Sequence, residues 1–89
     1  MESFILYAIS DSIGETAQQV AKAAISQFDI REETYDIKRF PYVSNKDILL
    51  EILENAKKEN AIIVYTLVSE NLGDIVKDYC QRENLHCID

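Results

Sequence analysis

The sequence is poor in the residues that mark several common kinds of site. Its two glycines, Gly14 and Gly73, stand far apart and no glycine-rich lysine motif occurs, so it carries neither a dinucleotide-binding fingerprint nor a P-loop. Two cysteines and one histidine do not make a zinc site, and we expect no metal. Cys80 and Cys87 are expected to be buried thiols in a reducing compartment rather than a disulfide.

Basic side chains and long apolar runs are also scarce. Sixteen acidic against nine basic residues give a net charge of −7, which repels a phosphate backbone, so nucleic acid is not an expected partner. The longest apolar runs are far shorter than the roughly 20 residues of a membrane-spanning helix. Residues 1–3 lack the basic start of a secretory signal. We therefore expect a cytoplasmic protein without membrane contact.

What is present is an ordinary globular composition. Hydrophobic residues make up 47% and charged residues 28% of the chain, which excludes disorder as the default. Without repeats or a convincing linker, residues 1–89 read as a single domain with a small core. The sequence stops on a predicted strand that no helix follows, so we expect the N-terminal α/β domain of a longer protein.

Residues 4–17 organise the chain. They open with six apolar residues that do not alternate with polar ones, which is typical of a parallel strand covered on both faces by helices. Ser12 and Glu15 then stand at the spacing of a capping box. Apolar residues at intervals of three and four predict that the helix runs from near Ile13 to Phe28.

The remaining chain repeats this alternation of strands and helices. We expect strands over residues 34–40, 61–68 and 85–89, and helices over 45–59 and from an N-cap at Ser69 through Cys80. Pro41 ends the second strand because it cannot donate to a ladder.

Two details of the later helices are also predicted. Ser44 and Asp47 have the spacing of a second capping box, with Val43 and Ile48 placed as its hydrophobic staple and Ile48 opening the buried stripe. Gly73 lies within the first turns of the last helix, where glycine costs roughly 1 kcal/mol relative to alanine, so we expect close packing there.

Alternating strands and helices predict an α/β fold with three layers, an open parallel four-stranded sheet and three helices, of flavodoxin or Rossmann type. The first and third strands are the most apolar and the second is the most polar, which favours the order 2-1-3-4. The margin of the last strand would have no outer neighbour, and unpaired margins invite self-association, so a homodimer is one expectation.

A candidate ligand or partner loop follows the first strand. In open α/β sheets ligands bind outside the carboxyl ends of the strands, where free helix amides favour anions. The loop would face Thr66 and Ser69 across the sheet, with basic residues from the second strand and second helix beside it. Its members are Ser10, Asp11, Ser12, Gly14, Glu15 and Thr16, flanked by Arg39 and Lys46. The alternative is that these residues only cap a helix.

Several short motifs carry a resemblance to a known family over nearly the whole length. They are Ile9-Ser10-Asp11 with Gly14-Glu15-Thr16-Ala17, then Ser26-Gln27-Phe28, then Phe40-Pro41-Tyr42-Val43, and finally Ile63-Val64-Tyr65-Thr66-Leu67-Val68. In this order they make the chain resemble the N-terminal part of the bacterial kinase-pyrophosphorylase family, also called pyruvate, phosphate dikinase or phosphoenolpyruvate synthase regulatory proteins.

The resemblance implies a bifunctional serine/threonine kinase and phosphorylase. Family members phosphorylate a threonine of their target using ADP, which inactivates it, and remove that phosphate with inorganic phosphate, forming pyrophosphate. Their nucleotide-binding P-loop lies in the C-terminal part, so we expect no catalytic residue and no cofactor within residues 1–89. ADP and phosphate would bind elsewhere, leaving target binding, dimerisation or regulation to this domain. The alternative is a free-standing flavodoxin-like module that binds a small phosphorylated ligand.

Overall fold

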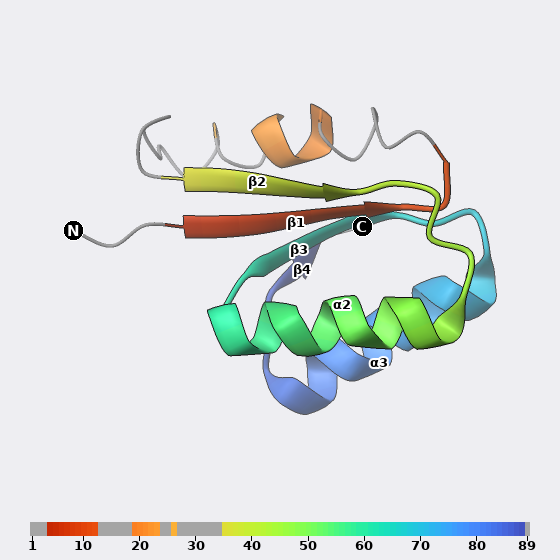
Figure 1. The fold of residues 1–89 in the computed structure, drawn as a ribbon. Helices are drawn as coiled ribbons and strands as arrows, with labels where there is room; N and C mark the ends of the chain where they lie inside the picture. The colour runs from red at the N-terminus through yellow and green to blue at the C-terminus, as the bar shows by residue number, and fades with distance from the viewer. Residues whose placement is uncertain (1–3, 13–18, 24–25, 27–34, 89) are drawn as a thin grey trace.

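The chain forms an open parallel sheet with helices on both faces (Figure 1). The computed structural model describes residues 4–12, 19–23, 26 and 35–88. The strands are β1 (Phe4–Ser10), β2 (Tyr35–Phe40), β3 (Ile62–Thr66) and β4 (Cys87–Ile88), and the labelled helices are α2 (Lys46–Glu59) and α3 (Glu70–Glu83). The spatial order is β2-β1-β3-β4, which confirms the predicted α/β fold and strand order.

The strand β1 lies at the centre of the sheet because it is apolar toward both faces. Its residues 6–10 are buried, and it pairs in parallel with β2 on one side and β3 on the other. Ser10 is in register with Thr66, so the carboxyl ends of β1 and β3 meet at one edge of the sheet.

The two faces of the sheet carry separate apolar clusters. Figure 1 shows α2 and α3 together below the sheet, while the helical residues 19–23 lie above it. The larger cluster, below, includes Tyr7, Ile9, Leu49, Leu53, Ile63, Tyr65, Val76 and Cys80. The smaller cluster, above, contains Leu6, Ala21 and Val64. This arrangement is the predicted three-layer packing, in which alternate residues of each strand face opposite layers.

The second helix begins one residue later than its capping signal predicted. Asn45, not Ser44, is the N-cap, and its Oδ1 accepts hydrogen bonds from the amides of Asp47 (2.7 Å) and Ile48 (3.3 Å). Val43 is buried, but Ile48 is 52% exposed, so the predicted staple is wrong. Ile48 lies about 100° around the helix from Leu49, which places it outside the buried stripe.

In the third helix, the predicted N-cap is confirmed and the predicted packing at Gly73 is wrong. Ser69 is the N-cap, and its hydroxyl accepts from the amide of Leu72 at 3.3 Å. A Cβ at Gly73 would meet no atom within 4 Å, so the expectation of close packing there is wrong. The helix ends at Asn84 in the left-handed conformation, as α2 does at Asn60.

The last two strands are shorter than their apolar runs predicted. The strand β3 ends at Thr66, and Val68, which was expected to lie within it, is 88% exposed. Here the amide of Val68 donates to the side chain of Asp11, far away in the sequence, and not to a strand partner. Cys80 is buried and Cys87 is half-buried, and both are free thiols.

The first predicted helix lies largely outside the described residues. Residues 19–23 and 26 are helical, which agrees with part of the predicted range from Ile13 to Phe28. Glu15, the second member of the predicted capping box with Ser12, lies outside the described residues. Among the described residues, no helix is both long and apolar enough to cross a lipid bilayer.

Candidate functional site

The three loops at the carboxyl edge of the sheet are held together by hydrogen bonds. We call residues 10–12, 41–46 and 67–69 the carboxyl-edge platform; they lie to the right in Figure 1, beyond the strand arrowheads. The amide of Tyr42 donates to the carbonyl of Ser12 at 2.8 Å, and the amide of Val43 donates to the carbonyl of Ser10 at 2.9 Å. The loop after β2 is thereby fixed to the loop after β1.

Asp11 fixes the other side of the platform. Its Oδ2 accepts from the amides of Val68 at 2.9 Å and Ser69 at 3.1 Å. Ser69 is the N-cap of α3 and Val68 precedes it, so the carboxylate lies near the positive end of the helix dipole. Ser69 was predicted to face the loop after β1 across the sheet, and the contacts of Asp11 agree with that placement.

The two serines beside Asp11 have different positions. Ser10 is fully buried, and its Oγ accepts from the amide of Ser12 at 3.1 Å and lies 3.1 Å from the Ser12 hydroxyl. This local hydrogen bonding shapes the turn. Ser12 is exposed, so of these two hydroxyls that of Ser12 is the one that solvent reaches.

The basic candidates lie on the rim of the platform. Arg39 is exposed near the end of β2, and Lys46 is exposed as the first residue of α2. The structure therefore brings Ser10, Asp11 and Ser12 to one edge with Lys46. The other predicted members, Gly14, Glu15 and Thr16, lie outside the described residues.

Two exposed apolar side chains on this edge were not predicted as site residues. Tyr42 is 68% exposed and Val68 is 88% exposed, one on each side of the loop after β1. The backbone of Tyr42 is left-handed, with φ 58°. An aromatic residue directly after Pro41 in a turn was the available signal for Tyr42. Val68 gave no such signal, because it ends an apolar run that predicts a buried strand.

An open pocket adjoins the platform between β3 and the first turns of α3. Its volume is about 270 Å³, and its lining residues are Tyr65, Leu67, Ser69, Glu70, Gly73, Asp74 and Lys77. The absence of packing above Gly73 contributes to this space. Within the described parts of the chain, no group of three histidine, cysteine or acidic side chains could hold a metal ion.

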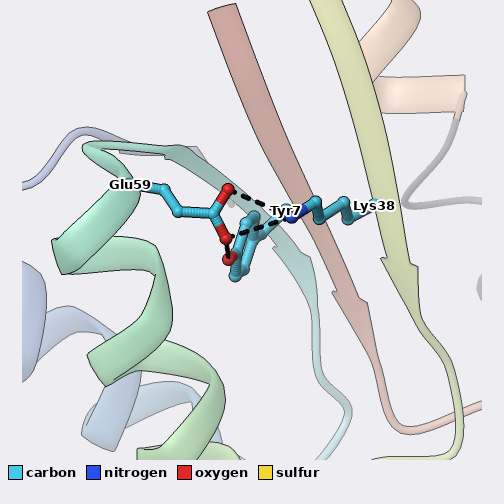
Figure 2. Close-up of polar contacts among 3 residues, drawn as sticks. All are labelled: Tyr7, Lys38 and Glu59. Carbon is cyan, nitrogen blue, oxygen red and sulfur yellow. Dashed lines mark hydrogen bonds and ion pairs between the residues drawn. The ribbon is translucent and has the colours of Figure 1, made fainter.

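A second polar cluster lies between the middle of the sheet and the end of α2, as Figure 2 shows. The Tyr7 hydroxyl of β1 donates to Oε1 of Glu59 at the end of α2, and Lys38 of β2 approaches the same carboxylate at 3.0 Å. The ammonium of Lys38 also lies 5.8 Å from the centre of the Tyr7 ring. Sequence reasoning missed this cluster, because its members are far apart in the chain.

The electrostatics of this cluster follow from its contacts. Burial, then the hydrogen bond to Glu59 and its negative charge, raise the pKa of Tyr7 to about 12. The hydrogen bonds from Tyr7 and Lys38 lower the pKa of the Glu59 carboxyl. Each group is therefore held in the form that makes the contact, so the cluster ties β1, β2 and α2 together.

Comparison of the chain with known proteins identifies its family. The model of the kinase/pyrophosphorylase family matches residues 6–89, and the chain belongs to that family, which confirms the predicted resemblance.

Curated relatives narrow the comparison to a particular group. Over the whole chain, 66% of residues are identical to a pyruvate, phosphate dikinase regulatory protein of Clostridioides difficile, of which the match covers 31%. Similar proteins of the same name occur in Alkaliphilus metalliredigens (49% identical over 99% of the chain and 31% of the relative) and Lysinibacillus sphaericus (39% over the whole chain and 33% of the relative). The chain thus spans about a third of the length of these relatives.

Proposed function

We propose that this chain is the N-terminal regulatory or target-binding domain of a bifunctional serine/threonine kinase and phosphorylase. The whole protein would act in the cytoplasm, inactivating a pyruvate, phosphate dikinase-type enzyme with ADP. It would reactivate that enzyme with inorganic phosphate, forming pyrophosphate. The observation that carries the proposal is the match over the entire chain to regulatory proteins named for that target.

The proposal assigns catalysis to another part of the gene product. Phosphoryl transfer depends on positioning and on neutralising charge at the phosphates, for which kinases use a lysine and a phosphate-cradling loop. These 89 residues contain no glycine-rich lysine motif. ADP and phosphate would therefore bind outside them.

The carboxyl-edge platform supports a role in protein recognition. A small phosphorylated ligand would be expected to use free amides at a helix N-terminus. At the start of α3, the amides of Val68 and Ser69 already donate to Asp11, and the amide of Leu72 donates to the Ser69 hydroxyl. An incoming phosphate would also meet the charge of that carboxylate. The free-standing flavodoxin-like module, the alternative from the sequence, is for this reason not favoured, nor do relatives three times as long favour it.

The test compares the 89-residue chain with the full gene product, using a purified dikinase as target. We expect the full gene product to inactivate the dikinase with ADP and to restore it with phosphate. The chain alone should bind the dikinase without transferring phosphate. Transfer of radiolabel to the dikinase by the chain alone would overturn the division of roles, and failure of the full gene product to act on the dikinase would overturn the function.

A further inference from the structure

Tyr42 has an unusual backbone conformation for its residue type. The described residues include three non-glycine positions with positive φ: Tyr42, Asn60 and Asn84. The two asparagines end α2 and α3, where the left-handed conformation is common and asparagine tolerates it. A bulky residue in that region is an outlier, and such strain occurs most often at functional sites.

The fold uses the backbone of Tyr42 but not its ring. The amide donates to the carbonyl of Ser12, and the next residue, Val43, is buried and donates to Ser10. These bonds fix the turn, while the ring remains 68% exposed. Glycine would satisfy the same backbone geometry without a Cβ. The aromatic side chain therefore lacks a structural reason within the described residues.

Val68 repeats this pattern on the other side of the same loop. Its amide is held by Asp11 at 2.9 Å, and its side chain is 88% exposed. Because Asp11 and Ser12 are consecutive, the turns that carry Val68 and Tyr42 are attached to neighbouring residues. Both side chains are thus presented by a backbone that hydrogen bonds hold in place.

Three of the four large exposed apolar side chains among the described residues belong to this edge. The four are Phe4, Tyr42, Ile48 and Val68. Phe4 opens β1 at the opposite edge, whereas the other three belong to the platform or to the first turn of α2. Lys46 adds an exposed positive charge beside them in a chain whose net charge is −7. A complementary surface would be apolar with a carboxylate at its margin.

We propose that Tyr42 and Val68 are the apolar anchors by which this domain docks on its target protein, with Lys46 pairing with an acidic group of that protein. The inference rests on the proposed function, since it takes the dikinase-type enzyme as the partner. Tyrosine is among the residues enriched at the positions that dominate binding energy in protein interfaces, so Tyr42 is expected to contribute more than Val68.

The decisive variant is Tyr42→Gly, because it separates binding from stability. Removing the ring should weaken binding to the dikinase at least about tenfold, as expected for an interface anchor. Relief of the left-handed strain should leave the melting temperature unchanged or higher. Val68→Ser should weaken binding in the same direction, and Lys46→Glu should weaken it most at low salt. Phe4→Ser, at the opposite edge, is the matched control and should bind as the unaltered chain does.

Binding is measured by titration calorimetry with the purified dikinase and with both the 89-residue chain and the full gene product, and self-association by sedimentation. If the unaltered protein binds and Tyr42→Gly and Val68→Ser bind equally well, the docking surface is wrong while the proposed function stands. If these variants lose self-association instead of dikinase binding, the occupant is a second copy and the inference fails. If the unaltered protein neither binds nor regulates the dikinase, the proposed function fails with it.

Discussion

The middle of the parallel sheet and its carboxyl edge are held in different ways. Under the middle, Tyr7 and Lys38 meet Glu59 through side chains only, and the Tyr7 ring is buried. At the carboxyl edge, Asp11 accepts from backbone amides, and apolar side chains beside it stay exposed, such as Val68.

This difference supports the proposed division between a structural cluster and a recognition edge. At the middle of the sheet, charged groups close a core whose apolar side chains already point inward. At the carboxyl edge, Asp11 fixes a turn that leaves the side chain of Val68 exposed. Function in open α/β sheets is concentrated at that edge, and here hydrogen bonds hold the described parts of its loops together.

The largest effect is expected from removing the Asp11 carboxylate at the carboxyl edge. Asp11→Ala would leave the amides of Val68 and Ser69 without their acceptor and should cost about 2 kcal/mol of unfolding free energy, a usual value for hydrogen bonds to a charged group. Inactivation of the dikinase by the variant should be slower than the loss of folded protein alone would explain, because the loops that carry Tyr42 and Val68 separate. Urea unfolding of the 89-residue chain measures the first effect. An inactivation assay with the full gene product, at a temperature where the variant stays folded, measures the second.

Asp11→Asn is the matched control for that variant. Asp11→Asn keeps an oxygen acceptor and loses the charge. Its unfolding free energy should therefore lie between those of the unaltered chain and Asp11→Ala. If Asp11→Ala regulates the dikinase as well as the unaltered protein does, the loop after β1 is purely structural.

The next effect removes a contact of the cluster under the middle of the sheet. Tyr7→Phe keeps the ring in the core and removes only the hydroxyl that donates to Glu59, so it should cost about 1 kcal/mol of unfolding free energy. Dikinase binding by the folded variant should be unchanged, because Glu59 lies at the end of α2 opposite to the platform residue Lys46. Lys38→Met is its control and should cost less than about 1 kcal/mol, because a surface ion pair contributes little. A loss of binding in Tyr7→Phe without unfolding would contradict the separation of this cluster from the carboxyl edge.

The same cluster predicts a dependence on alkaline pH. Folding raises the pKa of Tyr7 from its usual 10.0 to about 12. The stabilisation is therefore complete below pH 10 and is lost as the pH rises toward 12, because the folded protein holds a proton that the unfolded chain releases. Urea unfolding at pH 9 and 11.5 measures how far the unfolding free energy falls between these two pH values. The fall should be smaller for Tyr7→Phe than for the unaltered chain. Equal losses would mean that Tyr7 ionises as freely in the folded protein as in the unfolded chain.

The smallest expected effect is a gain in stability next to the platform. Gly73 lies inside α3, and a methyl group there would meet no atom within 4 Å. Gly73→Ala should therefore stabilise the chain by about 0.5 to 1 kcal/mol through helix propensity and a less flexible unfolded state. Thermal melts of the two proteins measure this gain. A destabilised variant would show that the space beside α3 is occupied in solution.

Much of the fold could be predicted because its signals are local. The run from Phe4 to Ile9 indicates a strand buried on both faces, and it is the central strand. Where adjacent residues compete, the local signal failed: Ser44 and Asn45 can both cap a helix, and Asn45 does so. Ile48 was wrongly assigned to the buried stripe for a different reason, which is its position around the helix.

The site was predictable in place but not in detail. Strand order put Asp11 and Ser69 at one edge, which needs only the alternation of strands and helices. Two features lay beyond sequence reasoning. The contact of Tyr7 with Glu59 joins residues 52 positions apart, and the exposure of Val68 depends on where Asp11 finds its donors.

Amide hydrogen exchange of the 89-residue chain, with and without the purified dikinase, tests most directly whether the carboxyl edge is the recognition surface. We predict that the dikinase slows exchange in residues 10–12, 41–46 and 67–69 and leaves the amino ends of β1 and β2 unchanged. Slowed exchange confined to the amino half, or to the outer edge beside β4, would contradict the assignment.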